Sequence, residues 1–298
     1  SILSCYSNDV KPIQPFRQEK HPGAGRVAAA FRLCYNFPMR IGVSTAAYYG
    51  RMETEESAAF LASLGVPCCE AFLQTYSEYQ PEFGRTLKAA AGKMEIVSAH
   101  NKTLHFEGDF LAQSPRQRAD GFAMLETFLE TAQLLGAGVY VYHGPPRLRG
   151  NNPPLDRWQP HIEEAIARCR AHGVRLCWET VSWAWLNSME RIEDFRRRWP
   201  ELGFTLDVKQ VMELGLEPAR VADAMGDRLC HVHMLDFDEN GRHALPGRGR
   251  SDFKAFSAAL RANGYRGDII LEPYAGQTED TGEVLRSLDW LRETFQAD

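Results

Sequence analysis

The sequence has no long apolar run and no concentration of positive charge. Although 44% of the 298 residues are hydrophobic, no stretch approaches the ~20 apolar residues of a membrane-spanning helix. Lysine and arginine are scattered along a chain whose net charge is −5, so it lacks the basic face that nucleic-acid binding requires. We therefore expect neither a membrane nor a nucleic acid as a partner.

The cysteines lack any paired spacing. They are Cys5, Cys34, Cys68, Cys69, Cys169, Cys177 and Cys230. Their number is odd, no CxxC motif occurs, and most of them lie within apolar runs. This pattern is typical of buried, reduced thiols and argues against a disulfide framework or a zinc cluster. It predicts a cytoplasmic protein.

The first 38 residues lack the hydrophobic periodicity of the rest of the chain. The run RVAAAFRLCY is too short and interrupted for the apolar part of a secretory signal, and a patterned strand begins directly after Met39. We expect residues 1–38 to be an N-terminal extension, either loosely structured or a non-native leader, and residues 39–298 to form one domain. The alternative is a segment that packs over the domain.

Beyond this extension, short apolar runs alternate with longer amphipathic segments. The apolar runs predict strands at 40–44, 66–73, 94–100, 138–143, 174–179, 204–208, 229–235 and 268–273. Helix signals lie between them: Thr54 is a predicted N-cap and Gly65 a predicted end, while Ser114 begins a helix that ends at Gly136. Eight strand–helix units predict an α/β fold, a single (β/α)8 TIM barrel. A doubly wound sheet is the alternative, but its GxGxxG turn is absent.

Side chains with metal-ligand chemistry lie at the ends of the last four predicted strands. Glu179 and Asp207 lie at the ends of the fifth and sixth strands, and His233 and Glu272 at the ends of the seventh and eighth. In a barrel they are neighbours at the carboxyl ends of the strands, where active sites form. Alternation along each strand lets all of them point inward. The alternative is a set of unrelated polar residues at loop edges.

A divalent cation would relieve the repulsion among converging carboxylates. Three carboxylates and one imidazole favour Mn²⁺, Mg²⁺ or Co²⁺, with Zn²⁺ as an alternative. The sequence therefore predicts one divalent metal ion as cofactor.

The motifs around these residues resemble a known family. WET, TLDVKQ, HVHMLD and LEPY, with MRIGVSTAAY and LPGRGRSDF, are similar to motifs of the xylose isomerase-like TIM barrels, and of their sugar phosphate isomerase/epimerase branch in particular. The resemblance covers 39–298. It implies an enzyme that isomerises or epimerises a small sugar or sugar derivative, with proton transfer through a metal-bound enediolate. It also implies that Glu179, Asp207, His233 and Glu272 hold the metal, and that Glu179 and Glu272 act as acid and base.

Further side chains near the same rim are candidates for substrate binding. They are His100, His143, Lys209, Trp183, Trp185 and Arg248. The resemblance places both histidines in the pocket. The lysine could bind an oxyanion, the tryptophans could form an apolar wall for a sugar ring, and the arginine could contact a phosphate. Each also has a purely structural interpretation, which we prefer for the deeper His231.

Other activities stay open. A dehydratase also begins by removing a proton next to a carbonyl, so a lyase acting on a keto-sugar, keto-inositol or related hydroxy-ketone is the alternative. A non-catalytic sugar-binding barrel fits less well because both outer glutamates are present. An AP endonuclease-like nuclease also fits less well, because Gln210 stands where the resemblance predicts a histidine for a nuclease. Dimers and tetramers are common among similar proteins, so a homo-oligomer is compatible.

Overall fold

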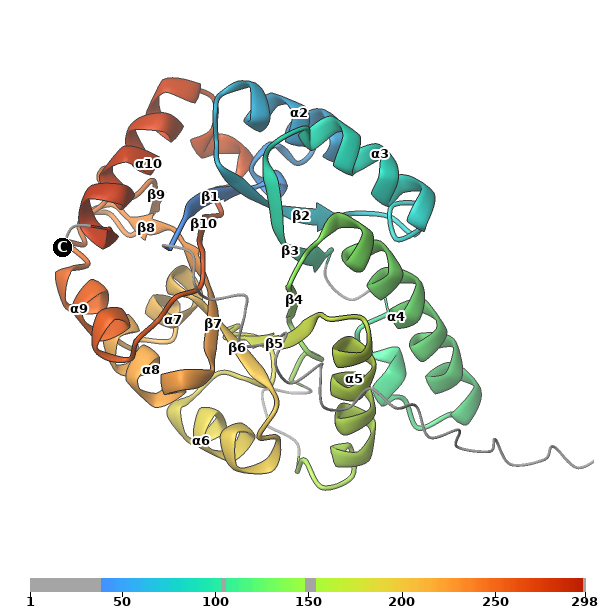
Figure 1. The fold of residues 1–298 in the computed structure, drawn as a ribbon. Helices are drawn as coiled ribbons and strands as arrows, with labels where there is room; N and C mark the ends of the chain where they lie inside the picture. Colours follow the sequence, from blue (N-terminus) through green and yellow to red (C-terminus); the bar gives the residue numbers. More distant parts are fainter. Residues whose placement is uncertain (1–38, 103–105, 148–153, 297–298) are drawn as a thin grey trace, which may run out of the picture.

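Eight parallel strands form a closed barrel at the centre of the molecule (Figure 1). The computed structural model describes residues 39–102, 106–147 and 154–296, so the expected extension at 1–38 lies outside the described residues. The barrel strands are β1 (Ile41–Ser44), β2 (Cys68–Leu73), β3 (Glu95–Asn101), β4 (Val139–Tyr142), β5 (Arg175–Glu179), β6 (Gly203–Asp207), β7 (Leu229–Met234) and β10 (Ile269–Leu271). Pairing of β1 with β10 closes the barrel. The predicted single TIM barrel is confirmed.

Helices surround the barrel on its outside (Figure 1). They are α2 (Thr54–Ser63), α3 (Pro81–Ala91), α4 (Pro115–Leu135), α5 (Gln159–Ala171), α6 (Met189–Arg198), α7 (Val208–Glu213), α8 (Pro218–Met225), α9 (Lys254–Ala262) and α10 (Thr281–Phe295). Short 3₁₀ helices span Thr45–Tyr48, Asp109–Leu111, Gly226–Arg228 and Ala275–Gln277. None of the helices in the described ranges has the length and apolar character that crossing a membrane requires.

Helix ends follow the predicted signals with one exception. The hydroxyl of Ser114 accepts the N–H of Gln117 and caps α4, which ends at Gly136 in a left-handed conformation. The prediction for α2 was wrong, because Thr54 is its first helical residue and Glu53 is the N-cap. The hydroxyl of Thr54 instead donates to the carboxylate of Glu78 at 3.0 Å.

The barrel strands separate two buried layers. The larger layer lies between strands and helices and includes Trp178, whose indole packs on Phe195 of α6 with ring centroids 4.7 Å apart. Inside the barrel, a small apolar cluster contains Val139, Val141, Cys177 and Cys230. Because side chains alternate along β5, Cys177 faces inward, and so does Glu179 two residues later. The barrel interior is therefore apolar at one level and polar at the next.

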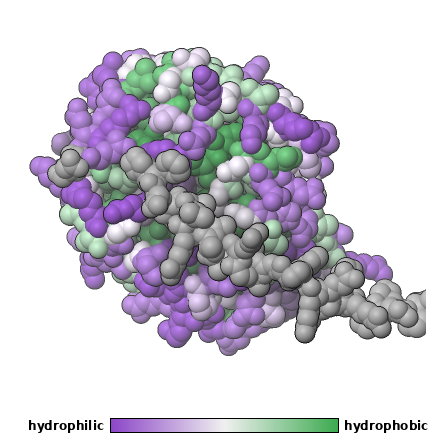
Figure 2. Space-filling view, in the orientation of Figure 1, coloured by the Kyte–Doolittle hydropathy of each residue, from purple (hydrophilic) through white to green (hydrophobic). Residues whose placement is uncertain are grey.

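Two features complete the fold. A hairpin of β8 (Asp236–Phe237) and β9 (His243–Ala244), which the sequence did not predict, follows β7. On the face seen in Figure 2, hydrophilic residues predominate around the edge and hydrophobic residues lie toward the middle. The described cysteines, Cys68, Cys69, Cys169, Cys177 and Cys230, are buried, and none of them forms a disulfide within the described residues.

Candidate metal centre and active site

The four residues predicted to bind a metal come together inside the barrel mouth. Glu179, Asp207, His233 and Glu272 each offer one ligand atom, and these atoms lie within 4.8 Å of one another. Nδ1 of His233 is 3.0 Å from Oε1 of Glu179 and 3.5 Å from Oε2 of Glu272. Glu179 and Asp207 are the last residues of β5 and β6, His233 is the last but one of β7, and Glu272 directly follows β10. We call these four residues the carboxylate cluster.

The electrostatics of the carboxylate cluster fit a divalent cation. Asp207 is 3% exposed; burial, together with the two neighbouring glutamates, raises its pKa to about 6 even though Lys209 opposes the shift. Ionising all three carboxylates in this space is therefore unfavourable without more positive charge. Carboxylate oxygens with one imidazole nitrogen are donors that Mn²⁺, Mg²⁺ or Co²⁺ accept. The donor set and the charge imbalance thus both suit the predicted metal.

A buried carboxylate that the sequence reasoning missed lies beneath the cluster. Glu70 of β2 is fully buried, and its Oε2 accepts hydrogen bonds from Ser98 at 2.9 Å, His233 at 3.0 Å and His231 at 3.2 Å. Its Oε1 accepts from Ser44 at 3.2 Å. Burial opposes its ionisation, but the surrounding histidines, His233 first, hold the pKa of Glu70 well below its usual value.

Glu70 is close enough to His100, His233 and Glu272 to be considered a ligand itself. Both of its oxygens already accept hydrogen bonds, so we place it behind the predicted ligands rather than among them. It holds Nε2 of His233 and leaves Nδ1 to face the other carboxylates, the arrangement in which a carboxylate orients a metal-binding imidazole. The available signal in the sequence was a charge inside the apolar run VPCCEAFL.

The two predicted pocket histidines contact each other. Nε2 of His100 is 2.9 Å from Nε2 of His143, which is itself 3.6 Å from Oε2 of Glu179. On its other side, Nδ1 of His100 is 3.6 Å from Oε1 of Glu272. Burial opposes protonation of His100, but hydrogen bonds with Glu272 and Glu70 raise its pKa to about 10.

Lys209 is buried among acidic groups. Its Nζ lies 3.4 Å from Oδ2 of Asp207 and 3.8 Å from Oε2 of Glu272, and it donates to the hydroxyl of Tyr274 at 2.9 Å. Burial opposes its charge, but Asp207 and then Glu272 raise the pKa of Lys209 well above its usual value. Its charge therefore already balances part of the carboxylate cluster.

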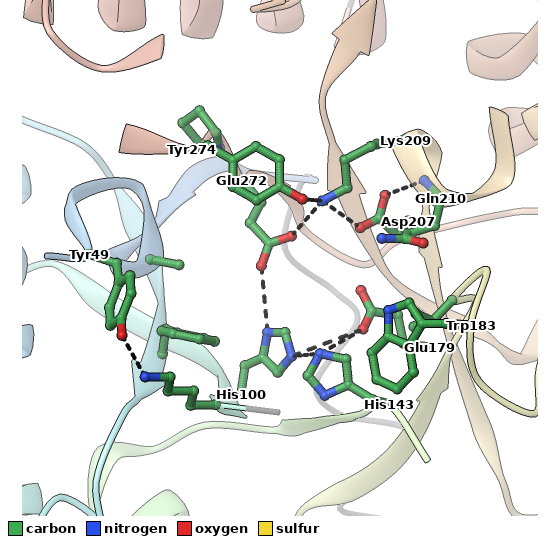
Figure 3. Close-up of a pocket in the computed structure, with 15 residues that line it drawn as sticks. Tyr49, His100, His143, Glu179, Trp183, Asp207, Lys209, Gln210, Glu272 and Tyr274 are labelled. Carbon is green, nitrogen blue, oxygen red and sulfur yellow. Dashed lines mark hydrogen bonds and ion pairs between the residues drawn. The ribbon is translucent and has the colours of Figure 1, made fainter. Parts of the chain in front are cut away.

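These groups open into a cavity of about 300 Å³. Figure 3 shows the carboxylates of Glu179 and Glu272 on two sides of the open space, with the histidines between them. The lining residues are Ala46, Tyr49, Phe72, His100, Lys102, His143, Glu179, Val181, Trp183, Asp207, Lys209, Gln210, Glu272, Pro273 and Tyr274. The aromatic and lysine side chains from the loops after β1, β3 and β10 had not been predicted.

Two predicted substrate-binding residues, Trp185 and Arg248, are not among those that line this cavity. Trp183 does, with its ring 5.9 Å from that of His143. Trp185, by contrast, is 5% exposed, because its large apolar surface packs against other rings, including that of Trp158. Arg248 reaches the surface of α10 and pairs with Glu283 at 2.6 Å.

The fold and this site define a (β/α)8 barrel with a polar, metal-type centre at the carboxyl ends of its strands. A model of the xylose isomerase-like TIM barrel family matches residues 58–294, and the chain belongs to this family.

Individual relatives fall into two classes. Over 150 residues the chain is 30% identical to a 3-dehydroshikimate dehydratase of Pseudomonas aeruginosa, an alignment that covers 44% of this chain and 24% of that protein. This chain thus spans about a quarter of the dehydratase. Over 209 residues it is 28% identical to the 3-dehydro-D-guloside 4-epimerase of Escherichia coli, covering 62% of this chain and 74% of that protein.

Solved structures share the fold. A D-psicose 3-epimerase in the presence of D-fructose matches with a TM-score of 0.72 at 17% identity, over 87% of this chain and 100% of that one.

Proposed function

We propose that the protein is a divalent-metal-dependent enzyme that isomerises or epimerises a small sugar or sugar derivative by moving a proton next to a carbonyl group. The observation that carries this proposal is the carboxylate cluster, which opens into a cavity of about 300 Å³. The known relatives include sugar-modifying epimerases and dehydratases, which supports the same class of reaction.

Glu179, Asp207, His233 and Glu272 would hold the metal, and Mn²⁺, Mg²⁺ or Co²⁺ suit these donors. When bound, such a cation acts as a Lewis acid that polarises a carbonyl oxygen and makes the neighbouring C–H more acidic. The expected cytoplasmic location and homo-oligomer remain predictions.

The two glutamates each divide their oxygens between the cluster and the cavity. Oε1 of Glu179 faces His233, while its Oε2 faces His143. Oε2 of Glu272 faces His233 and its Oε1 faces His100. Each carboxylate can therefore bind a metal through one oxygen and meet a substrate through the other.

Both glutamates are ionised in this environment, as a base must be. Burial opposes the charge of each, but His233 first of all lowers the pKa of Glu179, and His233 and His100 lower that of Glu272 to about 2. One carboxylate takes a proton from the substrate carbon. The other carboxylate, also ionised at rest, gains a proton from the protonated His100, whose ring lies 3.6 Å from Glu272 and 4.0 Å from Glu179, and passes it to that carbon. His100 and His143 together bind hydroxyl groups of the substrate.

A dehydratase is the second candidate, favoured by the 30% identity to a 3-dehydroshikimate dehydratase over 150 residues. It would share the proton removal and then release a hydroxyl group as water.

One experiment separates these activities. The Mn²⁺-loaded protein is incubated in D₂O with ketoses, keto-inositols and related hydroxy-ketones, the metal is removed, and the sugars are examined by mass spectrometry and NMR. An isomerase or epimerase places deuterium on a carbon of the recovered sugar, whereas a dehydratase yields a product lighter by one water. No reaction across a wide panel favours a binding protein.

Glu179→Gln and Glu272→Gln should each abolish deuterium incorporation, because an amide can neither take the proton from the carbon nor pass one to it. Glu283→Gln, on the surface of α10, is the matched control and should remain active. Retained exchange in both of the first two variants would show that the acid and base lie elsewhere.

A further inference from the structure

A second buried carboxylate lies behind the cavity wall, outside the carboxylate cluster. Glu107, between β3 and α4, is 0% exposed. Its Oε1 accepts from the hydroxyl of Tyr140 at 3.3 Å and from the backbone N–H of His143 at 3.4 Å. The hydroxyl of Tyr142 donates to its backbone carbonyl at 3.0 Å. A fully buried charge requires such donors, since burial without them costs several kcal/mol.

The other oxygen of Glu107 faces the ring of His143. Oε2 and Nδ1 are 3.3 Å apart, and among the described residues neither of these buried atoms has a hydrogen-bond partner. A carboxylate only accepts hydrogen bonds. The contact is therefore favourable only if Nδ1 carries the hydrogen.

The opposite nitrogen of the same ring faces the cavity. Nε2 of His143 is 2.9 Å from Nε2 of His100. The other ring nitrogen of His100 faces the carboxylates of Glu70 and Glu272, at 3.4 and 3.6 Å. His100 can thus donate from both nitrogens, and Nε2 of His143 can accept.

We propose that Glu107 is a positioning residue that fixes the hydrogen of His143 on Nδ1, so that Nε2 enters the cavity as a hydrogen-bond acceptor. In the free protein it accepts from His100, and in the complex it accepts from a substrate hydroxyl. The part that concerns substrate rests on the proposed function; the part that concerns the hydrogen position does not. Carboxylates orient imidazoles in this way in many sites.

The variant Glu107→Gln tests the proposal sharply. Two donors, the hydroxyl of Tyr140 and the backbone N–H of His143, already occupy Oε1, so they should hold the amide oxygen of the glutamine. Its NH₂ group then faces Nδ1, which must become an acceptor, and the hydrogen of His143 moves to Nε2. Tyr140→Phe is the matched control, because it removes a buried hydrogen bond to the same carboxylate and leaves Oε2 in place.

The hydrogen position is read by ¹⁵N NMR of histidine-labelled, Mg²⁺-loaded protein, with His143→Gln used to assign the signals. We expect the hydrogen on Nδ1 in the wild type and in Tyr140→Phe, and on Nε2 in Glu107→Gln. The wild-type spectrum alone overturns the proposal if it shows the hydrogen on Nε2. A folded Glu107→Gln that keeps it on Nδ1 also overturns it.

Turnover of any substrate found in the D₂O screen should fall by about 10- to 100-fold in Glu107→Gln, the usual effect of removing a group that orients a histidine. The Mn²⁺ affinity of Glu107→Gln should stay within about threefold of the wild-type value, because Glu107 contacts no member of the carboxylate cluster. Removing a group that supports a metal ligand directly typically costs about 10- to 100-fold in affinity. Unchanged turnover with a moved hydrogen would refute the positioning role. An inactive wild type with the expected spectrum would refute the proposed function and leave the hydrogen assignment standing.

Discussion

Replacing Glu70 with glutamine should weaken divalent-metal binding by about 10- to 100-fold, although Glu70 is not one of the predicted ligands. Its Oε2 lies 3.0 Å from Nε2 of His233, whose other nitrogen faces Glu179 and Glu272. The carboxylate therefore keeps the hydrogen of His233 on Nε2 and leaves Nδ1 free to bind a cation. The expected loss corresponds to about 1.4–2.8 kcal/mol, since each tenfold change is about 1.4 kcal/mol.

The same replacement should also destabilise the fold. Glutamine offers one oxygen and one NH₂ group where Glu70 accepts from serine and histidine donors on both oxygens. The NH₂ group must face at least one of these donors, so a buried contact becomes repulsive. Removing one member of a buried charge network costs about 3–5 kcal/mol, which chemical denaturation in EDTA measures independently of the metal.

The assay is competition for Mn²⁺ between the protein and a chelator, on wild type, Glu70→Gln and Ser98→Ala. Ser98→Ala removes a 2.9 Å hydrogen bond to the same carboxylate but leaves its contact with His233. This control should lose about 1 kcal/mol of stability and little metal affinity. Equal affinity in wild type and folded Glu70→Gln would refute the orienting role. An equal loss of metal affinity in Ser98→Ala would show that the effect comes from general destabilisation around Glu70 and not from the orientation of His233.

The other predictions concern the cavity and the core. Trp185→Ala should lower the free energy of unfolding by about 3–5 kcal/mol because it empties a buried space, whereas Trp183→Ala should raise KM and change stability little; the reverse pattern would refute the placement of the two rings. Burial raises the pKa of Cys69 to about 12, so mass spectrometry should find it unlabelled by iodoacetamide at pH 8 until the protein is denatured, and labelling of the native protein would contradict its burial. Lys102 lines the cavity and donates to the neutral hydroxyl of Tyr49, so a polyhydroxy carboxylate should inhibit more strongly than a neutral analogue of its size. Lys102→Met should remove that difference, and equal inhibition of the wild type by the two compounds would contradict this.

The parts of the site carried by barrel strands could be predicted from the sequence. A strand of a barrel has a fixed direction and a side-chain period of two. A residue at the end of an apolar run, such as Glu179, is therefore expected at the carboxyl end of its strand, with its side chain pointing into the barrel. Its separation from Asp207 matched one strand–helix unit, which placed the two side by side. Glu70 was not predicted as part of the site, because it lies inside an apolar run and its hydrogen-bond partners come from other strands.

The parts carried by loops could not be predicted. Trp183 and Trp185 are the same residue type two positions apart, and only the conformation of the loop decides that one ring faces the cavity and the other the core. Glu107 pairs with His143, 36 residues further along the chain, and no local pattern connects them. The hairpin after β7 consists of strands two residues long, too short for any periodicity to appear.

We expect stability and metal binding to be coupled in this barrel through His233. His233 contacts Glu70 with one nitrogen and two carboxylates of the cluster with the other, so one ring joins the buried support to the proposed metal centre. A cation that neutralises the cluster stabilises the folded chain by RT ln(1 + [M]/Kd), about 2.7 kcal/mol at a hundred times Kd. Variants that weaken the support should therefore lose both intrinsic stability and the gain from metal, and their melting temperatures should differ most from wild type when metal is in excess.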